Sequence, residues 1–442
     1  MVVGKQILSA SSTLGSSSTA VAAQEKRWIF YGYEVALGDQ VKWVNSSATS
    51  NDHCSWQAEE INVDSSNGTT STATNITFAE SSEATGPLQL CYRFSSGNNP
   101  FKLYPAITVN VYELYSVAAE EGSASLSVVG YPKVLALSGF GIAELDEGKW
   151  LLQGANDCSS ADFVALLARD LDGGNATAKV STSLDVSFEF TDEVFLSGGV
   201  GNESVNATLC YKFGSEEFQR YPVISMGIHH VTGWISSSGS SSVAVVGVPE
   251  DLIFTGYGLS EAATPGDRAR WIMSGTNCSE NVAPIMDAVD GRVDVFDGHG
   301  SFAFTASVSG ESPSLCYWFQ GEPAMLYTSL TIDVAYVSAL YASMFGDADV
   351  AVVGYPKAWG FAGGHIQNGD YVQWIYNESS DCSDSSSVAE MEEDGEIISG
   401  ETTATFATSV SGRWITPCYR YGLQGMMAGV GFVITLVDGN FA

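Results

Sequence analysis

The most reactive side chains in this sequence belong to eight cysteines, which are spread along the whole chain. They never occur in C-x-x-C spacing, and no paired histidines accompany them, so the pattern does not fit a zinc site. An even number of cysteines at recurring intervals is typical of disulfide bonds, which persist in oxidising compartments. The sequence therefore predicts disulfides among Cys54, Cys91, Cys158, Cys210, Cys278, Cys316, Cys382 and Cys418.

Asparagines in N-x-S/T triplets offer a second kind of chemistry, the attachment of N-linked glycans. A single triplet arises easily by chance in a chain this rich in serine and threonine. Eight triplets beside eight cysteines favour an extracellular or cell-surface protein. The predicted glycan acceptors are Asn45, Asn67, Asn75, Asn175, Asn202, Asn206, Asn277 and Asn377.

The remaining polar residues do not indicate a catalytic centre. The adjacent histidines His229 and His230 would point to opposite faces of a strand, so they cannot chelate one ion together. No G-x-S-x-G, H-E-x-x-H or P-loop motif occurs. A glycosidase pair of carboxylates stays open as an alternative, although acidic runs such as "EMEEDGE" from Glu390 lie in predicted turns. We therefore expect no enzymatic activity.

The charge of the chain restricts its partners. With 51 acidic and 18 basic residues, its net charge of −33 repels phosphate backbones and anionic membrane surfaces. The longest apolar run, "GMMAGVGFVITLV" from Gly425, is 13 residues and too short to cross a bilayer. We expect no nucleic-acid binding, no membrane insertion and no cofactor. Calcium binding is an alternative reading of the acidity, but the nearest segment, "RDLDGGN" from Arg169, lacks EF-hand spacing.

One short phrase occurs four times, as "LCYRF" from Leu90, "LCYKF" from Leu209, "LCYWF" from Leu315 and "PCYRY" from Pro417. A catalytic motif is normally present once, so this repetition favours architecture. A pair of residues nine apart recurs upstream of each phrase, as Ala23 and Gly32, Gly130 and Gly139, Gly247 and Gly256, and Gly354 and Gly363. A tryptophan, a cysteine and an N-G or D-G turn follow each pair. Each period of 102 to 121 residues contains about seven predicted short strands.

Alternate residues of a strand point to opposite faces of its sheet. Within "LCYKF", Leu209, Tyr211 and Phe213 should therefore face a core, and Cys210 should face away from it. A rhythm of one cysteine pair per repeat selects a single pairing from the 105 that eight cysteines allow. The predicted disulfides are Cys54–Cys91, Cys158–Cys210, Cys278–Cys316 and Cys382–Cys418.

The repeats predict an all-β fold of four tandem Ig-like β-sandwich domains with one disulfide each. The expected domains are 17–115, 124–234, 241–341 and 348–442, preceded by a separate segment, 1–16. Short linkers such as "SVAAEEGSA" from Ser116 and "SSSGSS" from Ser236 predict a fairly stiff rod. One segment, "DFVALLARDL" from Asp162, has the apolar spacing of a short helix.

The ten tryptophans fall into two groups. Four recur at one strand position, which favours core packing, with a sugar-stacking platform as the alternative: Trp43, Trp150, Trp271 and Trp374. The other six are candidates for contacts between domains or subunits: Trp28, Trp56, Trp234, Trp318, Trp359 and Trp414.

The repeating unit resembles Ig-like and TIG-like β-sandwich domains over nearly the whole chain. It departs from immunoglobulin domains in its order Trp–Cys–Cys and in a tyrosine directly after the second cysteine. Acidic, glycosylated arrays of cysteine-containing Ig-like domains are similar to subunits of extracellular filaments, such as the mastigoneme proteins of algal flagella. That resemblance implies a structural protein that assembles with copies of itself.

The start of the chain is similar to the closing strand that precedes the third unit, from Ser225. It predicts a strand from Met1 to about Ser9 whose own domain is missing or belongs to a neighbour, with apolar residues Val2, Val3, Ile7 and Leu8. Two alternatives remain. The chain is a window on a longer array, or the strand pairs with a neighbouring subunit and drives head-to-tail assembly.

The expected function is that of a structural subunit, or repeat segment, of a secreted, glycosylated extracellular filament or surface coat. The alternative is a cell-surface adhesin or carbohydrate-binding protein on a multi-domain stalk, and a secreted hydrolase is a third reading. A concave aromatic and acidic site on a single domain would favour the adhesin.

Overall fold

The structure, a computed structural model, divides the chain into two compact units, Met1–His229 and His230–Ala442, which are described separately. The fold is all-β, as the sequence predicts, and each unit contains two sandwiches. A 3-10 turn, η4 (Thr408–Val410), lies between the described strands β27 and β28. The structure describes residues 4–45, 54, 68–70, 73–78, 87–96, 99–152, 157–158, 177–191, 205–237, 243–261, 266–273, 275–279, 291–305, 311–343, 346–376, 382, 388–389, 391, 395–422, 427–428 and 432–438. The predicted helix from Asp162 lies outside these residues.

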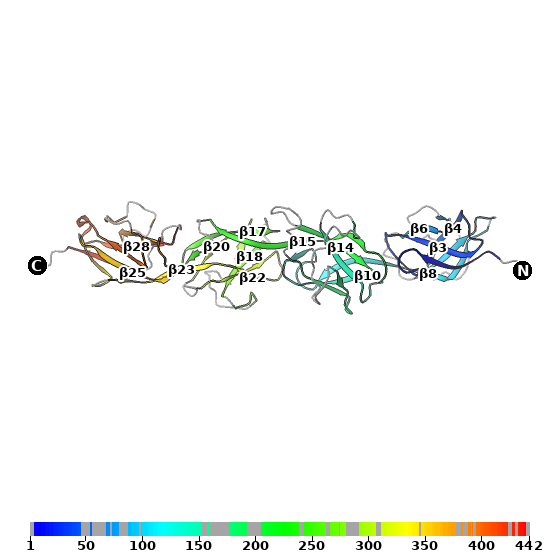
Figure 1. The fold of residues 1–442 in the computed structure, drawn as a ribbon, viewed down its shortest axis with the longest axis horizontal. Coiled ribbons are helices and arrows are strands. Elements are labelled where there is room, and N and C mark those ends of the chain that lie inside the picture. The colour runs from blue at the N-terminus through cyan, green and yellow to red at the C-terminus, as the bar shows by residue number, and fades with distance from the viewer. Residues whose placement is uncertain are drawn as a thin grey trace. The chain divides into compact units, whose positions relative to one another are not determined.

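In the first sandwich, the sheet β1-β3-β6 packs against the sheet β5-β4-β7-β8, with β2 parallel to β8 (Figure 1). The strands of these two sheets are β1 (Gln6–Ser12), β2 (Thr19–Val21), β3 (Glu25–Tyr33), β4 (Asp39–Asn45), β5 (Gly68–Thr70), β6 (Ala73–Thr77), β7 (Leu88–Arg93) and β8 (Lys102–Ala119). Alternate side chains of β3 are buried, as a strand with one solvent-exposed face requires. Trp28 and Phe30 from β3 meet Trp43 and Tyr92 of the other sheet in one core.

The second sandwich repeats this plan. The second half of β8 begins the sheet β8-β10-β13, and β9, β11, β12, β14 and the first half of β15 form the other sheet. The strands added here are β9 (Leu126–Val128), β10 (Lys133–Phe140), β11 (Glu147–Leu152), β12 (Ala178–Lys179), β13 (Asp185–Phe188), β14 (Val205–Lys212) and β15 (Gln219–Ser236). Trp150, Phe188 and Tyr211 are buried in its core.

The second unit contains the other two sandwiches. In the third, the end of β15 pairs with β17 and β17 with β20, while β18, β19, β21 and β22 form a second sheet. In the fourth, β23-β25-β27 packs with a sheet of β24, β26, β28, β29 and β30. The strands are β16 (Val243–Val245), β17 (Pro249–Tyr257), β18 (Asp267–Ile272), β19 (Val293–Val295), β20 (His299–Ala303), β21 (Ser314–Trp318), β22 (Met325–Thr331), β23 (Asp333–Ala342), β24 (Val350–Val352), β25 (Lys357–Gly364), β26 (Tyr371–Tyr376), β27 (Glu401–Ala404), β28 (Trp414–Arg420), β29 (Met427–Ala428) and β30 (Ile434–Val437).

Single strands serve two sandwiches, which corrects the expected domain boundaries. Residues of β8 up to Val109 pair with β7, and those from Glu113 to Ala119 pair with β10, so a boundary at 115 would cut a strand. In the same way β23 pairs with β16 and then with β25, across the expected end at 341. The expected end at 234 lies inside β15. The alternating pattern simply continues through each strand, and residues 120–125 after β8 lead into β9 of the second sandwich.

The first strand, β1, pairs within the first sandwich of its own chain. β1 pairs with β3 from Gln6↔Tyr33 to Ser12↔Trp28, and the Ile7 side chain is 2% exposed in the first core. The expected separate segment 1–16 is therefore wrong, because its strand is the opening strand of the first sandwich. Leu8 points outward and is exposed. Val2 and Val3 lie outside the described residues.

The repeated glycines allow a close approach between strands and a turn. At Gly139 the register between β8 and β10 shifts, which marks a β-bulge. A side-chain Cβ there would collide with the carbonyl oxygen of Glu113, so only glycine fits. The first glycine of the repeat, Gly130, instead has a positive φ of 75°, a conformation that favours glycine.

Candidate functional site

All eight cysteines form disulfides, and these join the pairs expected from the repeat. The Cα atoms of each pair lie 5.7 to 6.0 Å apart. Cys210 packs with Cys158 and Leu151 outside the main core, whereas Tyr211 faces the core, as the strand alternation predicts. The bonds are Cys54–Cys91, Cys158–Cys210, Cys278–Cys316 and Cys382–Cys418.

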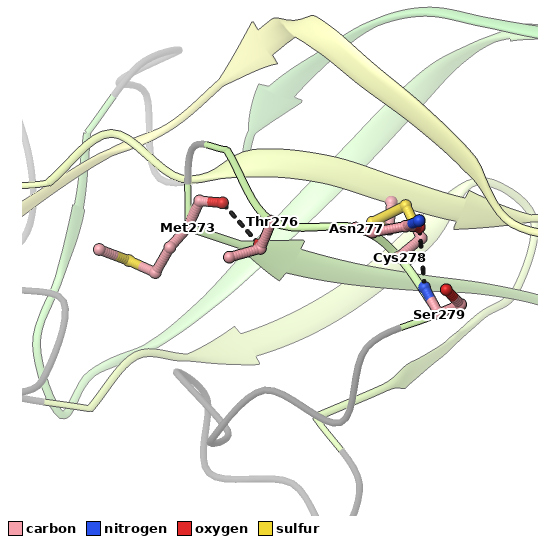
Figure 2. The surroundings of a disulfide bond; sticks show 6 residues. Met273, Thr276, Asn277, Cys278 and Ser279 are labelled. Carbon is pink, nitrogen blue, oxygen red and sulfur yellow. Dashed lines mark hydrogen bonds between the residues drawn. A yellow bond between two sulfur atoms is a disulfide. The ribbon is translucent and has the colours of Figure 1, made fainter.

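Figure 2 shows one glycan triplet beside a disulfide. Asn277 and Ser279 flank Cys278, and the Ser279 amide donates a hydrogen bond to Asn277 Oδ1 at 3.2 Å. Thr276 Oγ1 donates to the carbonyl oxygen of Met273 at 2.7 Å and closes the preceding turn. The Asn277 side chain is exposed, so a glycan has access to it.

The other predicted acceptors fall into three groups. Asn75 is exposed and its Nδ2 donates to Glu25 at 2.6 Å, and Asn206 in β14 is half-buried. Asn45 ends β4, and its side chain is outside the description. The others lie outside the described residues altogether: Asn67, Asn175, Asn202 and Asn377.

A buried aspartate in each sandwich holds the tyrosine of the repeated phrase. The Tyr211 hydroxyl donates to Asp146 Oδ2 at 2.9 Å, and the amides of Ala143 and Gly214 donate to the same carboxylate at 2.9 and 2.7 Å. The other three sandwiches repeat the contact as Tyr92–Asp39, Tyr317–Asp267 and Tyr419–Asp370. Each aspartate stands four residues before the repeated tryptophan, a spacing that the sequence contains and that sequence-based reasoning missed.

These aspartates and tyrosines are structural, because their hydrogen bonds are internal and their side chains are buried. Burial raises the pKa of Asp39, but hydrogen bonds from Tyr92, Ala36 and Ser95 outweigh that effect and leave the pKa below its ordinary value. Burial raises the pKa of Asp267 despite similar hydrogen bonds. Burial and the adjacent Asp146 carboxylate raise the pKa of Tyr211 well above its ordinary value.

Most of the described tryptophans that were candidates for binding are buried in the cores of the sandwiches. The recurring tryptophans are at most 1% exposed, so they are core residues and cannot stack on a sugar. Trp28 and Trp359 are also fully buried in cores, which contradicts their assignment to contacts between domains or subunits. Trp234 is buried too and packs edge-on against Trp271. Trp414 is exposed, Trp318 is half-buried, and Trp56 lies outside the described residues.

A metal site would need several ligating side chains close together in the part of the chain that the structure describes. No group of three histidine, cysteine or acidic residues there is close enough to hold a metal ion. The "RDLDGGN" segment considered for calcium lies outside that part. No described helix is long and apolar enough to cross a membrane.

The most elaborate polar site lies between the first two sandwiches, within the first unit. Lys26 Nζ contacts Glu216 Oε2 at 2.6 Å, and both side chains are only 5% exposed. Lys26 also donates to the carbonyl oxygens of Ser16 and Thr19 at 2.7 Å each. Glu216 in turn accepts from the Ser16 amide at 2.9 Å and from the Thr19 hydroxyl. Each charge is thereby paired and hydrogen-bonded, as burial requires.

Apolar and backbone contacts complete this joint. Val21 of the first sandwich is 1% exposed and belongs to the core of the second. Tyr112, in the middle of β8, packs on Phe213 with ring centroids 5.5 Å apart. Gln219 Nε2 donates to the Ala22 carbonyl oxygen at 2.8 Å. The first two sandwiches therefore share a strand, a hydrophobic contact and a buried ion pair.

No protein-family model and no curated protein matches the sequence. Among solved structures, the chain is similar to the N-terminal eight Ig domains of Down syndrome cell adhesion molecule, with 10% identity and a TM-score of 0.19. That match covers 97% of this chain and 49% of the other, so the chain spans about half its length. It is similar to extracellular domains 3–5 of Drosophila OTK, with 11% identity, a TM-score of 0.18, and coverage of 73% and 97%. It is also similar to the D1–D4 ectodomain fragment of ICAM-5, with 10% identity, a TM-score of 0.17, and coverage of 96% and 99%. These scores carry no argument about function, and the fold rests on the strand pairing and the disulfides.

Proposed function

We propose that the protein is a structural segment of a secreted extracellular filament or surface coat, in which sandwiches are joined head to tail. The joint of the first unit is the observation that carries this proposal. A strand common to two sandwiches and a buried ion pair resist bending and slippage, which a flexible linker does not. Ig-like sandwiches with such joints suit a load-bearing protein without catalytic activity.

Two further features support an extracellular location. The four disulfides are stable in an oxidising compartment. Exposed acceptors such as Asn75 and Asn277 suit N-glycosylation, and the net charge of −33 keeps neighbouring fibres apart in solution. In this proposal the partners are copies of the protein and its attached glycans.

Electron microscopy of secreted native material tests the proposal. We expect filaments or a regular coat labelled by an antibody to this chain, and glycosidase treatment should leave them assembled. Monodisperse particles at the native concentration, from material whose disulfides are intact, would contradict it.

A glycan-binding adhesin is a second candidate, because one hollow lies on the first sandwich. Its volume is about 540 Å³, and it is lined by Gly38, Gln40, Arg93, Phe94, Ser95, Asn99 and Pro100. Binding of the full chain to a glycan array, abolished by Arg93→Ala, would favour this function. Among its described lining residues none is acidic and Phe94 is the single aromatic residue, so we place this function second.

A further inference from the structure

The fourth sandwich contains a second copy of the lysine site found in the first joint. Lys357 Nζ donates to the carbonyl oxygens of Asp347 and Val350, the counterparts of the two carbonyls that hold Lys26. The lysine nitrogen lies 5.5 Å from the ring centroid of Trp359, and Lys26 lies at the same distance from Trp28. We call the site formed by Gly346, Asp347, Val350 and Lys357 the Lys357 cradle.

The Lys357 cradle lacks the carboxylate that completes the first joint. In that joint, Gly15 has a φ of +64°, and a side chain there would collide with the Glu216 carboxylate. Gly346 occupies the equivalent place with a φ of +106°, and of the described residues a Cβ there would meet only Lys357, whose Nζ would be 3.8 Å away. Among the described residues, no carboxylate lies within ion-pair distance of Lys357. No described residue therefore takes the place in the cradle that Glu216 fills in the first joint.

Apolar residues around the cradle are also less covered than their counterparts in the first joint. Val21 is 1% exposed there, whereas the equivalent Val352 is half-buried. Lys26 is buried and Lys357 half-buried. Tyr355, two residues before the lysine, is 63% exposed. The half-buried Val352 and Lys357 lie on the side of the sandwich that, in the first joint, contacts the next sandwich.

The cradle orients the Lys357 ammonium group so that it can bind an anionic partner. Burial lowers the pKa of Lys357, while the charges of Asp347 and Asp349 oppose that shift. Both aspartates are exposed, so water and salt screen them from an incoming group. The two carbonyl oxygens orient Nζ, and the carboxylate of a partner would complete its hydrogen bonds.

We propose that the Lys357 cradle docks an Ig-like sandwich that carries a glutamate in the turn after its C-Y-x-F strand. The second sandwich has Glu216 in this turn and the third has Glu322, which is 3% exposed. At the same sequence offset after its phrase, the first unit has Gly97 and the fourth has Gln424. The partner is therefore a sandwich with this glutamate, as the second and third have, and not the first sandwich of another copy. This inference rests on the proposed function and names the partner that continues the array.

An extended chain tests the proposal directly. Residues 113–236 are appended after Val437. Val437 pairs with Val352 as Tyr112 pairs with the equivalent Val21, so the appended residues continue the strand as they do in β8. Lysine acetylation is then measured residue by residue by mass spectrometry. We expect Lys357 to react in the original chain and to become at least about tenfold slower in the extended chain, as protected as Lys26. Glu216→Gln in the appended copy alone should restore the reactivity, and exposed Lys102 and Lys179 serve as unchanged controls.

Equal reactivity of Lys357 in both chains, with the appended disulfide formed, would overturn the proposal. A second measurement uses native assembled material treated with a zero-length carbodiimide cross-linker, for which Lys26–Glu216 is the internal control. We expect Lys357 linked to a glutamate that follows a C-Y-x-F strand. Filaments in which Lys357 is freely acetylated, or linked to the first sandwich of another copy, would overturn this inference and leave the filament function standing. A protected Lys357 without filaments would overturn only the function.

Discussion

At the scale of single residues, each sandwich is fixed by a buried aspartate that accepts a tyrosine hydroxyl. Tyr211→Phe removes one hydrogen bond from the buried Asp146 and leaves two backbone amides. We expect the second sandwich to lose about 1–3 kcal/mol of stability. Calorimetry of the full chain measures this, with Tyr115→Phe at an exposed tyrosine as the control. Equal unfolding temperatures for the two variants would show that the hydroxyl has no structural role.

The same tyrosine makes stability depend on alkaline pH. The pKa of Tyr211 is raised in the folded protein from its ordinary value of 10.0, mainly by burial. Well below pH 10 the folded and unfolded states both hold the Tyr211 proton, so this tyrosine adds no pH dependence to the stability. Above pH 10 the unfolded state releases it first, and stability falls as pH rises. Tyr211→Phe should flatten this fall for the second sandwich, and unfolding followed at pH 9 to 11.5 measures it.

Ala23 is the one non-glycine residue at the first position of the repeated pair. It has a φ of 60°, where the equivalent Gly130, Gly247 and Gly354 have 75° or 76°. An alanine in this left-handed region is strained by about 1 kcal/mol. Ala23→Gly should therefore raise the unfolding temperature of the first sandwich by about 4 °C or more in a scanning calorimeter. The reverse change, Gly130→Ala, should lower that of the second, and a fall with Ala23→Gly would contradict this explanation.

At the scale of elements, the sequence predicts much of each sandwich. The alternation in "LCYKF" places Cys210 and Tyr211 on opposite faces, and the repeat predicts every disulfide that the structure contains. The joints were mispredicted because loops rich in glycine and serine resemble linkers. In addition, no change in the residue pattern of β8 shows where the strand passes from the first sandwich to the second. The Lys26–Glu216 contact spans 190 residues, so no local pattern predicts it.

The bulge in β8 opposite Gly139 gives a direct test of this geometry. Gly139→Ala would place a methyl group against the Glu113 carbonyl oxygen in β8. We expect it to destabilise the second sandwich by about 3 kcal/mol. Gly148→Ala is the matched control, because its methyl group would have 3.6 Å to the nearest side chain. Denaturant unfolding should rank the two variants in this order, and the opposite order would refute the bulge constraint.

At the scale of the whole molecule, the first unit should behave as one body because its two sandwiches share a buried ion pair. Glu216→Gln leaves Lys26 charged and buried without its counter-charge. We expect a loss of about 3–5 kcal/mol and separate unfolding transitions for the two sandwiches. Lys212→Gln breaks a more exposed pair with Glu147 and should cost no more than about 1 kcal/mol. A single unchanged transition in the Glu216→Gln calorimetric scan would contradict this coupling.

The central claim is that sandwiches are joined by continuous strands, and amide hydrogen exchange across the middle of β8 tests it most directly. The Asn110 amide donates to the Ser18 carbonyl oxygen at 2.8 Å, and the Ala22 amide donates to that of Tyr112 at 2.9 Å. We predict that residues 110–113 exchange about a thousandfold more slowly than an unstructured chain, which corresponds to about 4 kcal/mol for opening. Exchange of residues 110–113 at the rate of a free peptide, beside protected residues in β7 and β10, would show a flexible linker and contradict the claim.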